Sequence, residues 1–500
     1  IKLFKEFNAE EVDALPKPYL WMVDGEHSVT VSQPSIINAM FFSPDGENTL
    51  RVLGSAQYNI KYADMVDKVY INGQPASFES QHDRRYISVN VPEAGDAYYQ
   101  ITIRFKDSIK TLQGAFRDNA NITVVDLSRF NSSITSTYQM FYNCANLEGV
   151  EIGNFNTRKV TTMQQMFNLC PKLTELDLST LKVDTVHNME LFAKFCTNLE
   201  TVIMPKSTPT NLISLAQAFA NCESLKAFDL GETWSELPNL AILAGILKNC
   251  YMIEEINWSL NTPSLVDLST AFAHMPRLRR MTLDIDVANV TNISNLAPCY
   301  ANEYPIVNPL EYVRFTRPFM EDVLEDVTDI FGMSPDSRPC GVLITESNFE
   351  DGVYNLIQTA LPTGMTHMCA DDNYFIATYD VKAEDIESGD PIPIFGDECP
   401  ALGDINTYVL GAQIPNYTFE YQFTEPSRYS VLVNWPNGVP SDINYMFGYC
   451  KTLVEVDFSH WSTAGVNDIS RMFEGCSGLS ELDVNNFDTS EVEYMNGMFA

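Results

Sequence analysis

The sequence predicts a mixed α/β repeat protein, in which leucine-rich-repeat-like solenoids alternate with small antiparallel β-sandwich domains. Three observations predict this fold class. Cysteines recur every 26 residues, a phenylalanine stands at a fixed distance before most of them, and each array follows segments in which apolar and polar residues alternate. A fixed period of this length indicates that each repeat is one structural unit, which buries its apolar face against the next unit.

The cysteines define the register of the repeat. The first four are each separated by 26 residues, the fifth follows after 28, and two more downstream are again 26 apart: Cys144, Cys170, Cys196, Cys222, Cys250, Cys450 and Cys476. Five of them have a phenylalanine three residues before: Phe141, Phe167, Phe219, Phe447 and Phe473. Phe499 continues the count, 26 residues after Phe473. The chain is therefore a repeat protein.

Each repeat predicts a short strand, a turn and a short helix. After Cys170, apolar residues stand at Leu173, Leu176 and Leu178, and alternation of the last two with a polar residue is typical of one face of a strand. A repeat closes with apolar residues about every three positions, as over 160–167 at the end of the preceding repeat, and this spacing predicts one side of a short helix. Successive strands should lie about 4.8 Å apart in a parallel sheet.

The repeat register places the strands in chain order. They are expected to begin near Ile122, Leu147, Leu173, Leu199, Leu225, Ile253, Leu278 and Leu310. Beyond them the pattern loosens: 318–331 predicts a longer helix, Gly341–Thr345 a strand, and Phe349–Leu361 a second helix. We interpret 318–372 as the atypical end that caps a solenoid.

The segments that precede the two solenoids resemble each other. Tyr99–Phe105 and Tyr429–Trp435 are both alternating, and each lies 11 or 12 residues before a repeat phenylalanine. Such runs, separated by turn residues, predict small antiparallel sandwiches and a duplicated module. The predicted organisation is an N-terminal segment (1–35), a β-sandwich (36–107), a solenoid (108–317), capping repeats (318–372), a second sandwich (373–437) and a second, incomplete solenoid (438–500).

Composition excludes several classes of function. With 500 residues, 45% of them hydrophobic, the chain can bury several cores. It carries 31 Lys+Arg against 66 Asp+Glu, a formal net charge of −35. This acidic field repels phosphate, so we expect no nucleic-acid partner and no binding to anionic lipid. No apolar run reaches the length of about 18 residues that would span a bilayer, so direct membrane insertion is not expected.

The repeat cysteines are open to three interpretations: metal ligands, disulfides or core residues. Metal sites favour close pairs such as C-x-x-C, which the sequence lacks, and the total of 11 cysteines is odd. Buried free thiols are the favoured interpretation, with disulfides between adjacent turns as the alternative. One irregular group could be a chelate, but we interpret its members as unrelated residues: Cys340, His367, Cys369 and Cys399.

Catalytic motifs are absent from the sequence. It has no G-x-S-x-G, no phosphate loop and no H-E-x-x-H, so we expect no enzyme activity, catalytic residue, cofactor or metal. The acidic pairs Asp371–Asp372 and Asp45 with Glu47 could hold Ca²⁺, but solvated loops are the favoured interpretation. Binding would use exposed positions on the strand face and in the turns, for example Arg129 or Arg158.

The repeats resemble the BspA-like leucine-rich repeats of bacterial surface proteins, in a 26-residue subtype. The unit of that subtype is roughly C-x-x-L-x-x-L-D-L-S-x-F-D-T-S-x-V-x-x-M-x-x-M-F, and Cys476–Phe499 matches it almost position by position. The resemblance covers about 108–300 and 441–500, and Cys250–Leu296 departs from it. The segments ahead of the arrays resemble PKD-like or Ig-like sandwiches, without their WGDGT motif. Similar arrays occur in bacteriophage virion proteins.

The resemblance implies attachment, protein binding and surface display. The expected location is extracellular, on a bacterial surface or a phage virion, and the expected partners are a protein or host-surface ligand and other subunits of an assembly. The alternative is a purely structural virion component, which the lack of a visible leader or anchor slightly favours. Because Phe499 and Ala500 stop in mid-repeat, we also expect further repeats or a partner subunit at this end.

Overall fold

The computed structural model describes residues 35–500 except 56, 93–95, 231–233, 299–309, 321–322, 333–339, 346–355, 358, 362–364, 370–372, 401 and 416–417. Apart from Ser35, the N-terminal segment predicted over 1–35 lies outside the described residues. The chain forms two compact units. Unit 1 comprises Ile1–Arg277, Asp284–Tyr304 and Asp322–Gly332, and unit 2 comprises Leu278–Leu283, Pro305–Glu321 and Met333–Ala500.

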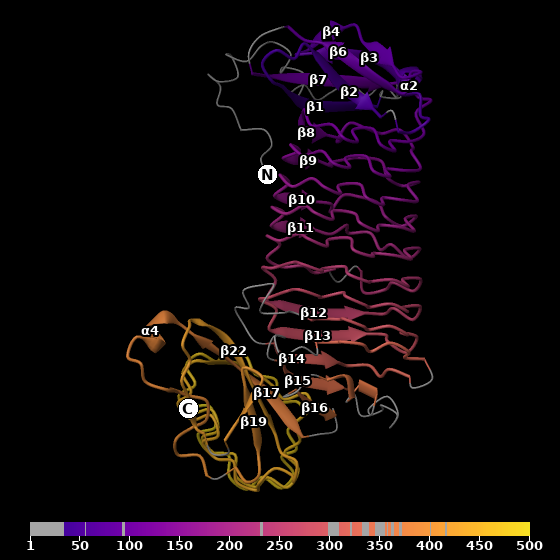
Figure 1. Cartoon of the computed structure of the whole chain (residues 1–500). Coiled ribbons are helices and arrows are strands. Elements are labelled where there is room, and N and C mark those ends of the chain that lie inside the picture. The colour runs from indigo at the N-terminus through magenta and orange to yellow at the C-terminus, as the bar shows by residue number, and fades with distance from the viewer. Residues whose placement is uncertain are drawn as a thin grey trace, which may run out of the picture. The chain divides into compact units, whose positions relative to one another are not determined.

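Strands and turns make up nearly all of the described structure (Figure 1). Up to residue 277 the elements are β1 (Ile36–Ser43), β2 (Thr49–Gly54), α2 (Tyr62–Met65), β3 (Val66–Ile71), β4 (Gln74–Ala76), β5 (Glu79–Gln81), β6 (Tyr86–Asn90), β7 (Ala97–Phe105), β8 (Ile122–Asp126), β9 (Gly149–Glu151), β10 (Glu175–Asp177), β11 (Thr201–Ile203) and β12 (Glu255–Leu260).

The remaining elements lie in unit 2, apart from the last two residues of β13. They are β13 (Arg280–Ile285), β14 (Leu310–Phe315), β15 (Cys340–Thr345), β16 (Thr366–Cys369), β17 (Tyr374–Val381), α4 (Ala383–Ile386), β18 (Ile392–Pro393), β19 (Asn406–Val409), β20 (Ala412–Ile414), β21 (Glu420–Tyr421), β22 (Ser427–Asn434) and β23 (Leu453–Asp457).

Unit 1 is a β-solenoid whose first strand pairs with the edge of an antiparallel sheet. The strand order is β4-β3-β7-β1-β8-β9, in which β1 is antiparallel to both β7 and β8, whereas β8 and β9 are parallel. A second sheet contains β2, β6 and β5. The prediction of a separate β-sandwich over 36–107 is therefore corrected. The largest sheet of this segment continues into the solenoid, because the first repeat strand, β8, pairs with β1.

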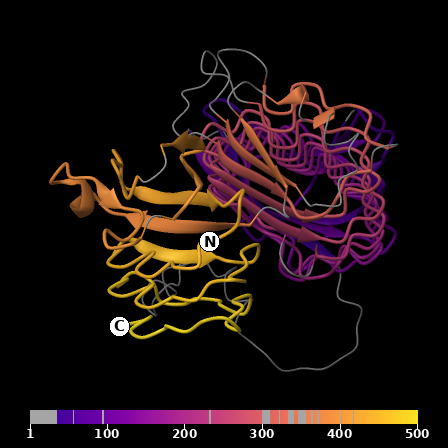
Figure 2. The same cartoon turned by 90° about the horizontal axis from the view of Figure 1, so that it is seen from below.

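Eight successive turns of unit 1 are joined by isolated parallel bridges. The bridged residues are Ser136, Thr162, Asn188, Ser214, Ile242, Asp267, Asn292 and Asp326. Figure 2, which looks along this stack, shows the turns of unit 1 lying one behind another. Strands are assigned close to most predicted starts, but Leu225–Leu230 has no assigned strand, although its apolar side chains are still buried. These buried side chains belong to the apolar core of the solenoid.

The helix predicted in every repeat is wrong. Over 160–167, alternate amides donate to the next turn: Met163 N–H to Asn188 O at 3.0 Å, and Gln165 N–H to Glu190 O at 2.9 Å. The amide of Met166 instead donates to Met163 O at 3.2 Å, within its own turn. A helix would direct every amide to a carbonyl four residues earlier in the same segment. A run of tight turns produces the same three-residue apolar rhythm, which explains the error.

The longer helix predicted over 318–331 is also wrong. Asp326 is bridged to Asn292, and Ile293 N–H donates to Asp326 O at 2.9 Å, so this segment is one more turn of the solenoid. Phe331 is buried there in the position of the other turn phenylalanines. The strand predicted over Gly341–Thr345 is present as β15. Most of the helix predicted over Phe349–Leu361 lies outside the described residues, and only 356–357 and 359–360 are helical.

Unit 2 repeats the arrangement of β1, β7 and β8. The strand order is β20-β19-β22-β17-β23, and β17 is antiparallel to both β22 and β23. The register shifts between Met40 and Phe41 in β1, and at the corresponding place between Thr378 and Tyr379 in β17. The two sheets therefore share this irregularity. As in unit 1, the sheet runs into the solenoid, because β17 pairs with the repeat strand β23, and the described residues of 373–437 are not a separate domain.

Candidate binding surfaces

The repeat cysteines lie in the cores of the two solenoids as free thiols. All five in unit 1 have no exposed surface, and Cys450 and Cys476 are also buried. The Cys170 thiol donates to Phe141 O at 3.0 Å, and the same carbonyl accepts the Cys144 amide at 3.2 Å. Each such thiol therefore joins one turn to the turn before it.

Burial makes these thiols poor nucleophiles. It raises the pKa of Cys144, Cys196 and Cys250 to about 12, and that of Cys476 to about 11, from an ordinary value near 9. Burial also raises the pKa of Cys170 well above its ordinary value. Burial therefore keeps these thiols protonated over a wider pH range than an exposed thiol.

The turn phenylalanines form a second buried ladder. The rings of Phe141 and Phe167 stack at 5.3 Å between centroids with 5° between their planes, and Phe116 stacks on Phe141 in the same way. Sequence reasoning missed Phe192, which packs edge-on against Phe167 at 5.3 Å and against Phe219 at 6.1 Å. In this repeat the phenylalanine precedes the cysteine by four residues, so the fixed spacing could not find it.

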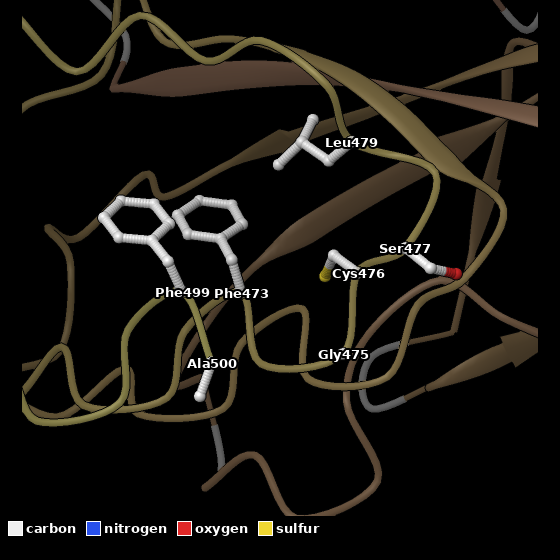
Figure 3. Close-up of a pocket in the computed structure, with 7 residues that line it drawn as sticks. All are labelled: Phe473, Gly475, Cys476, Ser477, Leu479, Phe499 and Ala500. Carbon is white, nitrogen blue, oxygen red and sulfur yellow. The ribbon is translucent and has the colours of Figure 1, made fainter.

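The distal ladder has the same geometry. Phe447 and Phe473 stack at 5.4 Å, and Phe473 and Phe499 at 5.8 Å. Figure 3 shows the rings of Phe473 and Phe499 side by side on a cavity of about 310 Å³, with Cys476 and Leu479 on its wall. These residues occupy the core positions of the repeat. The cavity is therefore an opening into the solenoid core, and Ser477 contributes a hydroxyl group to its lining.

The outward positions of β9 to β12, and of the unassigned segments beside these strands, form the exposed surface that we call the strand face. Its exposed residues are Glu148, Thr174, Asp177, Glu200, Thr201, Ile203, Lys226, Ala227, Asp229, Glu254, Glu255, Asn257 and Ser259. They include six carboxylates and a single ammonium group, that of Lys226, which is paired with Glu200. The strand face is therefore acidic, and its exposed apolar side chains include Ile203 at 49% exposure.

The two arginines suggested from the sequence lie in turns and away from the strand positions. Arg129 is exposed after β8, and its carbonyl accepts the Ile36 amide at 3.2 Å. Arg158 is exposed after the core residue Phe155, and its carbonyl accepts the Thr185 hydroxyl at 3.3 Å. The structure gives these two residues no common site.

In unit 2, outward strand positions are covered by a second sheet. Side chains from β15 and β16 pack against side chains from β17, β19 and β22 in one buried apolar cluster: Val342, Ile344, Met368, Tyr374, Ile376, Tyr408 and Leu432. Arg279 and Glu311 form an ion pair beside this cluster, and Ser430 N–H donates to the Glu311 carboxylate at 3.2 Å. Arg314 pairs with Asp457 at 3.1 Å. In unit 2, outward strand positions are therefore buried by a second sheet of the same chain.

No metal centre is found where the structure describes the chain: it shows no group of three or more His, Cys, Asp or Glu that could hold an ion. The side chains of Cys340, His367 and Cys369 and the pair Asp371–Asp372 lie outside the described residues. Cys399 is buried, and its thiol is 3.4 Å from Pro400 O. Of the other acidic pair, the Glu47 carboxylate accepts the Asn121 amide at 2.9 Å.

Within the described ranges, no helix has the length and hydrophobicity needed to cross a bilayer.

Two family models match parts of the chain. A family model described as "BspA type Leucine rich repeat region" matches residues 188–298 in six copies. A second, described as "Mycoplasma protein of unknown function, DUF285", matches residues 110–234 and 419–500. No curated protein and no solved structure matches the chain. The chain therefore contains a BspA-type leucine-rich repeat region over 188–298 and a DUF285 domain over 110–234 and 419–500.

Proposed function

We propose that the protein is a non-catalytic attachment protein of a bacterial surface, which binds other proteins through the strand face. Repeats of the BspA type support a surface location and protein binding, because proteins that contain them are typically surface proteins. The protonated repeat thiols support a role without thiol chemistry. The ligand on this proposal is a protein.

The observation that carries the proposal is the contrast between the two sides of each strand. The inward positions keep the same apolar character from turn to turn, for example Leu173, Leu199 and Leu225, because they fill the core. The outward positions differ between turns and are exposed. A stacked solenoid offers such an outer surface as one extended binding area.

The charge of the strand face indicates the chemistry of the partner. Six exposed carboxylates against one ammonium group favour a basic protein surface, and a chain with a net charge of −35 would attract it from a distance. The apolar side chain of Ile203 supplies contact area among these charges. Binding should therefore weaken as salt concentration rises, because salt screens exposed charges.

The test uses the full chain and a panel of purified extracellular proteins that range from acidic to basic, measured by biolayer interferometry. The strand-face variant Asp177→Lys/Asp229→Lys is compared with a control of equal charge, Asp184→Lys/Asp390→Lys, whose aspartates are exposed elsewhere. We expect basic panel members to bind, and the strand-face variant to weaken binding at least about tenfold, or 1.4 kcal/mol. Equal effects of the two variants would contradict the proposal.

The alternative of a purely structural virion component predicts a different result in the same experiment. The full chain would then associate with itself into a symmetric assembly and would bind no panel protein.

A further inference from the structure

A cavity of about 560 Å³ in unit 2 has the composition of a binding site. Three aromatic residues contribute to its lining, Phe395, Phe419 and Tyr449, together with two carboxylates, those of Asp397 and Glu420. The volume lies within the range of about 300–1,000 Å³ that is usual for ligand pockets. The cavity lies between the chain around β18 and β21 and a turn of the second solenoid.

Backbone hydrogen bonds hold the walls of this cavity in place. Phe395 N–H donates to Phe419 O at 3.0 Å, and Gly396 N–H donates to Met446 O at 3.0 Å. A Cβ atom on Gly396 would lie only 2.1 Å from Tyr445 O, so the close approach of the two segments requires glycine there. The cavity is therefore formed before any ligand binds.

Tyr449 presents an aromatic side chain to solvent at the cavity. It is 48% exposed, and its hydroxyl donates to the Glu474 carboxylate at 2.7 Å, which restrains the ring. Its backbone is left-handed, with φ of 63°, a conformation uncommon for a bulky residue. Phe395, in contrast, is buried, and its ring stacks on that of Phe447 with 6.3 Å between the ring centroids. It therefore forms a fixed apolar part of the cavity wall.

The charged side chains in the described lining of the cavity are two exposed carboxylates, those of Asp397 and Glu420. The basic group of Arg471, near Tyr449, is already paired with Glu474 at 3.6 Å. The hydrogen bond to Glu474 and the nearby charges of Glu474 and Glu398 raise the pKa of Tyr449. A cation would gain from both the carboxylates and the faces of the aromatic rings.

We propose that this cavity binds a long basic side chain of a protein partner, arginine in preference to lysine. The planar guanidinium group stacks on aromatic rings and matches a carboxylate with two parallel hydrogen bonds, whereas an ammonium group does neither as well. The alkyl stem would lie against the apolar wall. This assignment rests on the proposed function, because it names the chemistry by which a bound protein is recognised.

The test measures fluorescence anisotropy of labelled hexapeptides with the full chain at 150 mM salt (about the physiological level). One peptide contains two arginines, and matched peptides contain lysine or the neutral isostere citrulline at those positions. We expect saturable binding of the arginine peptide, weaker binding of the lysine peptide and at least about tenfold weaker binding of the citrulline peptide. Equal affinity for the arginine and citrulline peptides would overturn the proposal.

Variants distinguish binding of the arginine peptide at this cavity from its general electrostatic attraction to an acidic protein. We expect Asp397→Asn/Glu420→Gln to weaken the arginine peptide at least about tenfold, and Tyr449→Leu by about threefold to thirtyfold. Glu481→Gln, an exposed carboxylate on the next turn, should change affinity less than twofold. Loss of affinity from Glu481→Gln equal to that from Asp397→Asn/Glu420→Gln would overturn the assignment. If the peptides do not bind the cavity, the strand-face experiment can still succeed, since its strand-face variant changes Asp177 and Asp229 of unit 1.

Discussion

Arg279 and Glu311 form an ion pair in which both side chains are only 2% exposed. The Arg279 Nε–H donates to Glu311 Oε1 at 3.0 Å, and the guanidinium group also lies 4.8 Å from the centre of the Tyr429 ring. Both residues occupy outward positions at β13 and β14, where the sequence pattern indicates solvent. Burial of this pair therefore depends on the sheet of β17 and β22 that covers it.

The first prediction concerns the cost of breaking this pair. Glu311→Leu should lower the free energy of unfolding of the full chain by about 3–5 kcal/mol, because it leaves the Arg279 charge buried without its partner. The double variant Arg279→Met/Glu311→Leu should recover most of that loss, since two apolar residues replace both charges. Urea unfolding of the four proteins in the cycle measures both values. A double variant as unstable as the single one would show that the pair is not the cause.

The second prediction concerns thiol reactivity. Cys144, Cys170, Cys196, Cys222 and Cys250 should resist a thiol reagent in the native protein and react on unfolding, because all are fully buried. Alkylation followed by peptide mass spectrometry, with and without denaturant, reports each cysteine separately. Rapid native labelling of Cys170 or Cys196, or a disulfide between neighbouring turns, would contradict the core assignment.

The third prediction follows from the sign of the thiol pKa shifts. In the folded state the pKa of Cys196 is raised to about 12, and it returns to near 9 on unfolding, so the folded state holds the proton more tightly. The stability it contributes is therefore fully present below pH 9 and is lost as pH rises from 9 to 12. Between pH 9 and 12 the unfolding free energy of the unmodified protein should therefore fall more steeply with pH than that of Cys196→Ala. The expected difference in slope is about 1.4 kcal/mol per pH unit.

Urea unfolding of both proteins at closely spaced pH values measures the difference in slope. Equal slopes between pH 9 and 11 would contradict burial of this thiol.

The fourth prediction compares two phenylalanines of the first solenoid. Phe167→Ala should lower the free energy of unfolding by about 3–5 kcal/mol, because Phe167 has no exposed surface and stacks on Phe141. Phe195→Ala is the matched control: Phe195 is 38% exposed, and its change should cost less than about 1 kcal/mol. Chemical unfolding measures both. Similar losses for the two variants would show that the ladder contributes nothing specific.

The sequence predicted the inward side of each repeat well, because core positions repeat at a fixed spacing. Phe167, Cys170 and Leu173 all lie in the core as that spacing requires. The helix prediction failed because helices and successive tight turns both place apolar residues about three apart. The partner of the Met163 amide is Asn188 O, 25 residues away, and local periodicity contains no information about it.

A signal for the turns was nevertheless present in the sequence. Seven of the eight bridged positions of unit 1 are Ser, Thr, Asn or Asp, and their side chains accept the amide two residues later, as Asn188 Oδ1 accepts Glu190 N–H at 2.8 Å. The residue three positions after each bridge has positive φ: Gln139, Gln165, Leu191, Gln217, Gly245, Thr270, Asn295 and Asp329. Such side-chain caps favour turns over helix interiors.

The joining of sheet and solenoid and the binding surfaces could not be predicted from spacing. Pairing of β1 with β8 joins residues that are 88 positions apart, such as Asn38 and Asp126. Neither segment contains a sequence signal that identifies its partner strand. The cavity at Tyr449 likewise combines segments that are distant in the sequence. The acidic character of the strand face, in contrast, follows from the strand register, once the outward positions are known.

Carboxyl footprinting tests the central claim, that the strand face binds protein partners, most directly. The full chain is labelled with a carbodiimide and an amine, alone and saturated with the tightest-binding basic protein of the panel, and labelling is read by mass spectrometry. We expect Asp177, Glu200 and Asp229 to lose labelling in the complex, whereas the exposed carboxylates of Asp184 and Asp390 keep theirs. Unchanged labelling of the three strand-face carboxylates in a saturated complex would contradict it.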